Sequence, residues 1–62
     1  MNNLYKDGDT FYYVLYNHVT NNYYTMAYKY WDKWDHCFNH ELMFKTKEDA
    51  EQKAIQMNKN LA

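Results

Sequence analysis

The chain has 62 residues, of which 47% are apolar and 21% are aromatic, and its formal net charge is -1. Eight Tyr, three Phe and two Trp exclude a disordered chain, because disordered segments are poor in rings. The length allows a single domain, and a chain this short buries only about 60% of the surface that it exposes when unfolded. The lone cysteine, Cys37, excludes an internal disulfide.

Ser, Arg and Pro are missing from the sequence. The lack of Ser excludes a serine nucleophile, and the lack of Arg excludes bidentate binding of guanine or phosphate by a guanidinium group. The net charge of -1 lacks the basic excess that is typical of nucleic-acid-binding domains. No apolar run approaches the ~20 residues that span a bilayer, and residues 1–5 lack the basic and apolar parts of a signal peptide. With its single unpaired cysteine, the chain is therefore expected to be cytoplasmic and to have no membrane partner.

The first half of the chain predicts a β-hairpin. Residues 6–9 contain Asp-Gly, a strong turn signal, and β-branched and aromatic residues predict a strand over residues 10–17. The sequence leaves open whether residues 4–5 pair back across this turn as a short extra strand. The Asn-rich residues 17–22 predict a loop, and residues 23–31 predict the second strand.

The second half predicts a polar turn at residues 32–35, a third strand over residues 36–44 and a helix over residues 47–60. Thr46 is a good N-cap, and acids follow it where the helix dipole favours negative charge. Four apolar residues fall within about 60° of one another on this helix: Ala50, Ala54, Met57 and Leu61. The predicted fold is a single α+β domain over residues 1–62, with a three-stranded antiparallel sheet and one C-terminal helix packed on one face.

A single helix covers one face of such a sheet, so the pleat decides which rings are buried. The more apolar sets are predicted to face the helix: Phe11, Tyr13 and Leu15; Tyr24, Met26 and Tyr28; and Phe38, Leu42 and Phe44. Tyr and Trp are enriched at the energetic centres of interfaces, although tyrosines also simply suit half-buried strands. The candidate partner interface comprises the outward rings, their acidic neighbours and an apolar residue off the helix stripe: Tyr12, Tyr16, Tyr23, Trp31, Asp32, Trp34, Asp35 and Ile55.

His36, Cys37 and His40 are residue types that bind zinc, and a nearby Asp could complete the set. The spacing suits a metal only if residues 32–40 form a helix, because in a strand the two histidines lie roughly 13 Å apart. We therefore expect two half-exposed histidines, a buried cysteine and neither metal nor cofactor. Adjacent strand residues point to opposite faces, so a nucleophile–base pair is not expected either, and the sequence predicts no enzyme.

Residues 44–51 contain the pattern Phe-x-Thr-x-Glu-x-Ala and resemble the strand-to-helix corner of arm-type DNA-binding domains in phage integrases. The likeness covers eight of 62 residues, and its pattern is a generic helix cap. It implies three strands followed by one helix, and a small nucleic-acid-binding or regulatory domain as the alternative function. That family reads its groove with basic residues, whereas acids alternate with lysine in residues 32–35.

Asn, Lys and Tyr make up 23 of the 62 residues, and all three are read from AT-rich codons such as many phages use. In its size, slight acidity and lack of Arg, the chain resembles small phage-encoded inhibitors of host defence, of the anti-CRISPR and anti-restriction type. This resemblance is one of type and not of motif. It implies a non-enzymatic protein-binding module, commonly a homodimer, that covers a surface of a larger nucleic-acid-processing host enzyme. The rings would give affinity and the acids would steer association.

Overall fold

Two long strands form a hairpin on which the rest of the chain is built. The computed structural model describes residues 4–61. β1 (Thr10–Asn17) and β2 (Asn22–Lys29) pair antiparallel, and β3 (Met43–Phe44) adds to the other edge of β1, so that the strand order is β2-β1-β3. α1 (Lys47–Lys59) follows β3 directly. The predicted α+β class, with three antiparallel strands and one C-terminal helix, is confirmed.

Local hydrogen bonds form the two turns that the sequence predicts. At the Asp-Gly turn, the Asp9 N–H donates to the Lys6 carbonyl at 2.9 Å, and Gly8 takes a φ of 91°, which favours glycine. At the hairpin tip, Asn21 takes a φ of 57°, a conformation that Asn tolerates, and its N–H donates to the Asn17 carbonyl at 2.8 Å. Both turns are confirmed.

The predicted third strand over residues 36–44 is wrong for most of its length. Only Met43–Phe44 pair with β1, while η1 (Asp32–Cys37) and η2 (His40–Leu42) are 3-10 helices. β2 also ends two residues earlier than predicted. The Asn39 side chain accepts the N–H of Glu41 at 2.9 Å and so caps η2. Polar side chains that bond to nearby backbone outcompete extended pairing in this segment. We call residues 31–42 the helical loop.

α1 packs on the side of the sheet that carries Val14. The Thr46 hydroxyl accepts the Asp49 N–H at 3.2 Å, which confirms the predicted N-cap. The small Ala50 and Ala54 let the helix approach closely, and Val14 is left only 1% exposed between them. Larger side chains close the rim of this cluster: Tyr12, Tyr23, Leu42, Phe44 and Met57. Leu61, predicted to belong to the helix stripe, instead lies beyond the last turn and is 49% exposed.

The predicted assignment of the sheet faces is wrong for both long strands. Residues paired across β1 and β2 share a face, and their neighbours in sequence point to the other one. Since Val14 faces α1, the residues predicted to face the helix lie on the opposite side: Phe11, Tyr13, Leu15, Tyr24, Met26 and Tyr28. Of the third predicted set, only Leu42 and Phe44 pack with the helix. The prediction assumed a bare second face, but Phe38 of the helical loop packs on that face together with Tyr5 and Tyr30.

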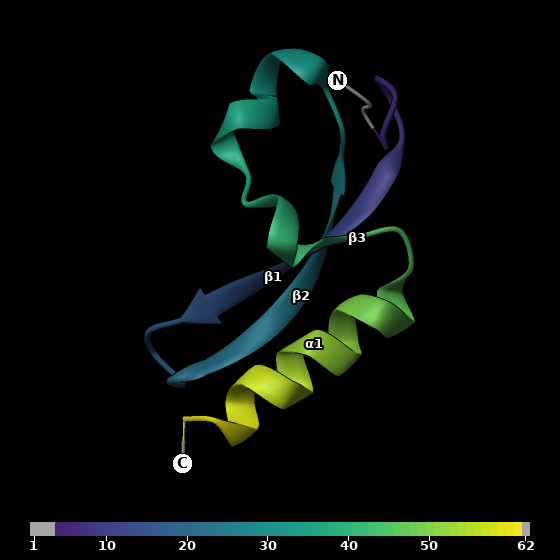
Figure 1. The fold of residues 1–62 in the computed structure, drawn as a ribbon. Coiled ribbons are helices and arrows are strands. Elements are labelled where there is room, and N and C mark those ends of the chain that lie inside the picture. The colour runs from purple at the N-terminus through teal and green to yellow at the C-terminus, as the bar shows by residue number, and fades with distance from the viewer. Residues whose placement is uncertain (1–3, 62) are drawn as a thin grey trace.

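Phe11 forms the centre of an aromatic cluster on this second face. It is fully buried, and the centroids of five rings lie 5.0–6.4 Å from its own: Tyr5, Tyr13, Tyr28, Tyr30 and Phe38. Tyr5 is therefore a core residue, and residues 4–5 do not form the extra strand that the sequence left open. Burial raises the pKa of the Tyr5 hydroxyl. Figure 1 shows the helical loop and α1 on opposite sides of the two long strands.

Replacing Phe38 tests this cover of the second face. Phe38 is half-buried, and its ring centroid lies 5.0 Å from those of both Phe11 and Tyr13. We expect Phe38→Ala to lower the free energy of unfolding by about 2 kcal/mol, less than a fully buried Phe would cost. Trp34→Ala, a change at a 51% exposed ring on the same loop, should cost less than about 0.5 kcal/mol. Urea titration followed by circular dichroism measures both, and equal losses would contradict this packing.

Candidate interaction surface

A short chain of hydrogen bonds fastens the helical loop to the aromatic cluster. The hydroxyl of the buried Tyr30 donates to Asp35 Oδ1 at 2.7 Å, and His40 Nε2 lies 2.9 Å from the same oxygen. The bond from Tyr30 lowers the pKa of Asp35, partial burial opposes this, and His40 and His36 lower the pKa further. Asp35, predicted as a partner contact, is thus engaged by side chains of its own chain.

The predicted interface residues on the strands lie on the α1 side of the sheet. Tyr12 and Tyr23 are half-buried in the rim of the helix-side cluster. Tyr16 lies at the hairpin end of that side, where it is 37% exposed and its hydroxyl donates to Asn21 Oδ1 at 3.2 Å. The ring of Tyr16 also lies 5.0 Å from that of Tyr23. These rings do not form the outward row that the sequence predicted, because α1 covers their face.

The remaining predicted interface residues lie elsewhere on the surface. Trp31 is 45% exposed on the helical loop, and Trp34 is exposed on its first helix. Asp32 is exposed, and its backbone N–H donates to Asp7 Oδ1 at 2.7 Å. Ile55 is 50% exposed on α1. The structure therefore does not bring the eight predicted residues together on one face.

The candidate metal ligands do not gather into one site. Cys37 is exposed, contrary to the prediction, because η1 replaces the expected strand, and its Sγ lies 3.7 Å from His36 Nε2. Across residues 4–61, no three His, Cys, Asp or Glu side chains gather in a way that could hold a metal ion. In the same range, the structure has no helix whose length and apolar character would let it cross a membrane.

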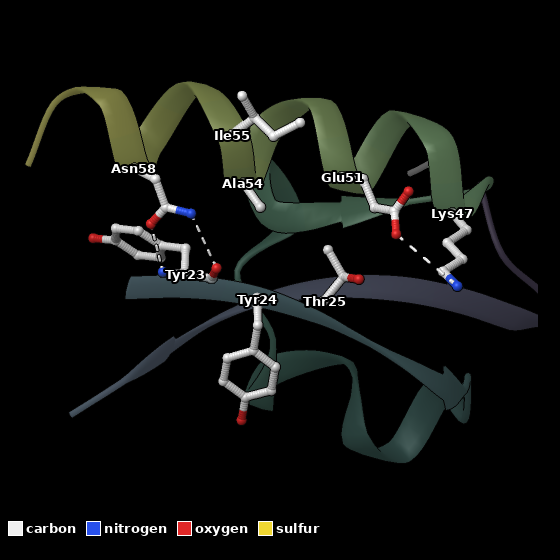
Figure 2. A pocket seen from close by; sticks show the side chains of 8 residues that line it. All are labelled: Tyr23, Tyr24, Thr25, Lys47, Glu51, Ala54, Ile55 and Asn58. Carbon is white, nitrogen blue, oxygen red and sulfur yellow. Dashed lines mark hydrogen bonds and ion pairs between the residues drawn. The ribbon is translucent and has the colours of Figure 1, made fainter. Parts of the chain in front are cut away.

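An apolar area remains uncovered on the second face near the hairpin. Leu15 and Tyr24 pair directly across the strands, and Met26 follows Tyr24 on the same side. Tyr24 is 39% and Met26 is 46% exposed, whereas Leu15 is half-buried. Figure 2 shows Tyr24 pointing away from α1. We call Leu15, Tyr24 and Met26 the open patch. Sequence reasoning missed it because it placed all three side chains under the helix.

The helical loop stops short of the open patch. Its Phe38 ring covers the face as far as Tyr13, whose hydroxyl accepts the Asn39 N–H at 3.0 Å. Met26 pairs with Tyr13 across the strands, so the patch begins where this cover ends. Both strands that carry the patch are hydrogen-bonded to each other, and its side chains are therefore presented on a fixed backbone.

β2 is an edge strand, and its outer side is hydrogen-bonded at one position by α1. The Asn58 side chain accepts the Tyr23 N–H at 2.6 Å and donates to the Tyr23 carbonyl at 3.1 Å (Figure 2). Asn58 thus takes the place that a neighbouring strand would occupy. In an antiparallel strand, the backbone N–H and C=O groups of every second residue point to the same edge. The backbone groups of Thr25 and Ala27 therefore point to the outer edge of β2, as those of Tyr23 do. Within residues 4–61 these groups have no hydrogen-bond partner.

An open groove of about 480 Å³ lies between this edge and α1. It is lined by residues from both elements: Tyr23, Tyr24, Thr25, Lys47, Glu51, Ala54, Ile55 and Asn58 (Figure 2). Lys47 Nζ lies 4.0 Å from Glu51 Oε2, one helical turn away. Sequence reasoning missed this groove, since an Asn in the last turn of a helix gives no signal of its contact with a strand.

Comparison with protein-family models, curated proteins and solved structures finds no match for this chain. The strand-to-helix corner at residues 44–51 has the predicted form, with β3 leading into α1 through the Thr46 cap. The contacts, burial and charge of the chain's own residues are therefore the basis for its proposed function.

Asn58→Ala tests the contact between α1 and the edge of β2. The change removes two hydrogen bonds to the backbone of Tyr23, and we expect a loss of about 1–2 kcal/mol in the free energy of unfolding. The amide proton of Tyr23 should also exchange faster with solvent. Asn60→Ala, at an exposed position past the helix end, is the matched control and should change neither quantity. The same exchange rate for Tyr23 in all three proteins would contradict the contact.

Asp35→Asn tests the bond that fastens the helical loop. A carboxyl group whose pKa is lowered by folding stabilises the fold above its ordinary pKa of about 4, and this contribution is lost as the pH falls through the lowered value. The melting temperature of Asp35→Asn should therefore lie below that of the wild type at about pH 5.5, and the gap should narrow as the pH falls below about 4. A gap that is independent of pH would contradict this role for Asp35.

Proposed function

We propose that this protein is a non-enzymatic module that binds another protein through the open patch. The observation that carries the proposal is the contrast within one sheet face. Around Phe11 the face is sealed by the rings of its own chain, whereas Tyr24 and Met26 remain 39% and 46% exposed beside each other. Adjacent large apolar side chains that stay exposed are typical of contact sites.

The chemistry of the open patch suits a protein partner. Met26 is flexible and adapts to the shape of a partner surface, while Tyr24 offers a large ring with a hydroxyl at its tip. Because both project from a paired hairpin, little backbone order has to be gained on binding. The patch lies on a strand surface, which matches a protein surface better than it encloses a small molecule.

The proposed mode of action is occlusion, in which the module covers a working surface of a larger host defence enzyme. Its support is the resemblance in type to phage-encoded inhibitors and the exposed acids of the helical loop, Asp32 and Glu41. Exposed acidic side chains on the module would speed its association with a basic, nucleic-acid-processing surface.

The experiment uses a photo-crosslinking phenylalanine derivative in place of Tyr24, in cells that carry the natural partner. A partner joined at position 24, and not at the control position 53 on α1, is identified by mass spectrometry, purified and titrated. We expect Met26→Asp to weaken binding by at least about tenfold with unchanged circular dichroism, because a charge would be buried in the contact. Thr20→Asp, at the exposed hairpin tip, should bind like the wild type.

Two results would overturn the proposal. One is equal affinity of the wild type and Met26→Asp for the purified partner. The other is tight binding of a single-stranded or duplex oligonucleotide that weakens steeply with salt, which would favour the nucleic-acid-binding alternative.

A further inference from the structure

We propose that two copies of this chain join through the outer edges of β2, antiparallel and centred on Ala27. The partner is thus a second copy, and the two sheets become one continuous sheet. A β edge with free N–H and C=O groups is a ready template for such pairing. This inference uses the edge of β2, whereas the proposed function uses the open patch on its face, and Met26 is the patch residue that takes part in both.

The contact of Asn58 with Tyr23 sets the register. Asn58 is hydrogen-bonded to both the N–H and the C=O of Tyr23, so an added strand can pair only with the free backbone groups from Thr25 onward. A symmetric pairing that uses only these positions places Ala27 opposite the partner's Ala27 and Thr25 opposite the partner's Lys29. Each such outward pair exchanges two backbone hydrogen bonds. The register therefore follows from groups that α1 leaves free.

The side chains of β2 match each other in this register. On the α1 side, two small Ala27 side chains meet at the symmetry axis and leave room for the helices. On the side of the sheet that carries the open patch, Met26 lies opposite the partner's Tyr28. The two-fold axis repeats this Met–Tyr pair, so the dimer contains it twice. A cross-strand pair of Met and Tyr buries apolar surface that is exposed at Met26 in the single chain.

The charges on the α1 side are complementary. Thr25 and Glu51 line the same groove, so a Lys29 placed opposite the partner's Thr25 lies beside the partner's Glu51. Within residues 4–61 the Glu51 carboxylate makes only a long, exposed contact of 4.0 Å with Lys47, which leaves it able to accept a second ammonium. In the single chain, the Lys29 ammonium is exposed and donates to the Gly8 carbonyl at 3.4 Å, a long bond that a carboxylate contact would replace. The two-fold axis forms this Lys–Glu contact twice.

The course of α1 leaves this part of the edge accessible. Its last turn reaches the edge of β2 at Tyr23, and its first residue, Lys47, lines the groove beside the half-buried Thr25. Ala27 and Lys29, further along β2, are exposed. The C-terminal half of β2 is thus the more open half. In the joined sheet both open patches lie on the same side, opposite both helices.

Charge reversal and rescue test the pairing. Sedimentation equilibrium of the wild type over a wide range of concentration should give twice the mass of the chain at the upper end. Lys29→Glu and Glu51→Lys should each weaken dimerisation about five- to tenfold, and the double variant should recover most of the wild-type affinity. Ala27→Pro, which removes the central N–H at an edge where Pro is tolerated, should be monomeric with unchanged helix content.

Three outcomes would overturn the inference. The first is a wild type that remains monomeric at every concentration. The second is a double variant that is no better than either single variant. The third is a dimer that Met26→Asp disrupts and Ala27→Pro does not, since that pattern would place the contact on the open patch rather than on the edge. None of these outcomes depends on the foreign partner, so failure here leaves the proposed function standing.

Discussion

The packing of rings around Phe11 is the contact on which the rest of the structure depends. A hairpin and one helix leave a sheet face bare, and this chain has no disulfide with which to compensate. Tyr5 from the N-terminal segment and Phe38 from the helical loop both pack on Phe11 and seal part of that face. Each ring pair adds about 0.5–1.5 kcal/mol beyond the apolar area that it buries. The cluster thereby gives a short chain a second core on the side that α1 does not reach.

The same cluster decides which surfaces remain free. Its cover ends at Tyr13, so the hairpin end of the face keeps Tyr24 and Met26 exposed. On the other side, α1 is fixed close to the sheet by its two buried alanines, and Asn58 in its last turn closes β2 at Tyr23. The open patch and the free part of the β2 edge are thus adjacent but chemically distinct. The apolar face is the proposed contact for a foreign protein, and the backbone edge is the proposed contact for a second copy.

Signals that act over a few residues predicted their elements well. The Asp-Gly turn, the Asn-rich hairpin loop and the Thr46 cap each fix a local backbone, and the strands and helix beside them were placed within two residues. The prediction of a third strand over residues 36–44 was wrong because the alternation of apolar residues there resembles a strand, whereas Asn39 caps a 3-10 helix by accepting the N–H of Glu41.

The sheet faces were assigned wrongly because contacts between residues far apart in the sequence decide what covers each face. Ranking each strand's two faces by apolar character assumes that only the helix supplies a cover. The contact of Phe38 with Phe11 contradicts that assumption. The residues around Phe38 resemble a strand in sequence and do not indicate that this segment folds back as a helical loop over Phe11. The contact of Asn58 with Tyr23 spans 35 positions and has no sequence signature either. The candidate site depends on these two contacts, which is why its residues differ from those that the sequence predicted.

Proton–proton contacts measured by nuclear Overhauser spectroscopy on isotope-labelled protein test the central claim most directly. The account predicts that the Phe38 ring shows contacts to the rings of Phe11 and Tyr13, while the methyl groups of Ala50 and Ala54 show contacts to Val14. Contacts from the Ala50 or Ala54 methyl groups to Phe11 would place the helix on the other face, and the account would be contradicted.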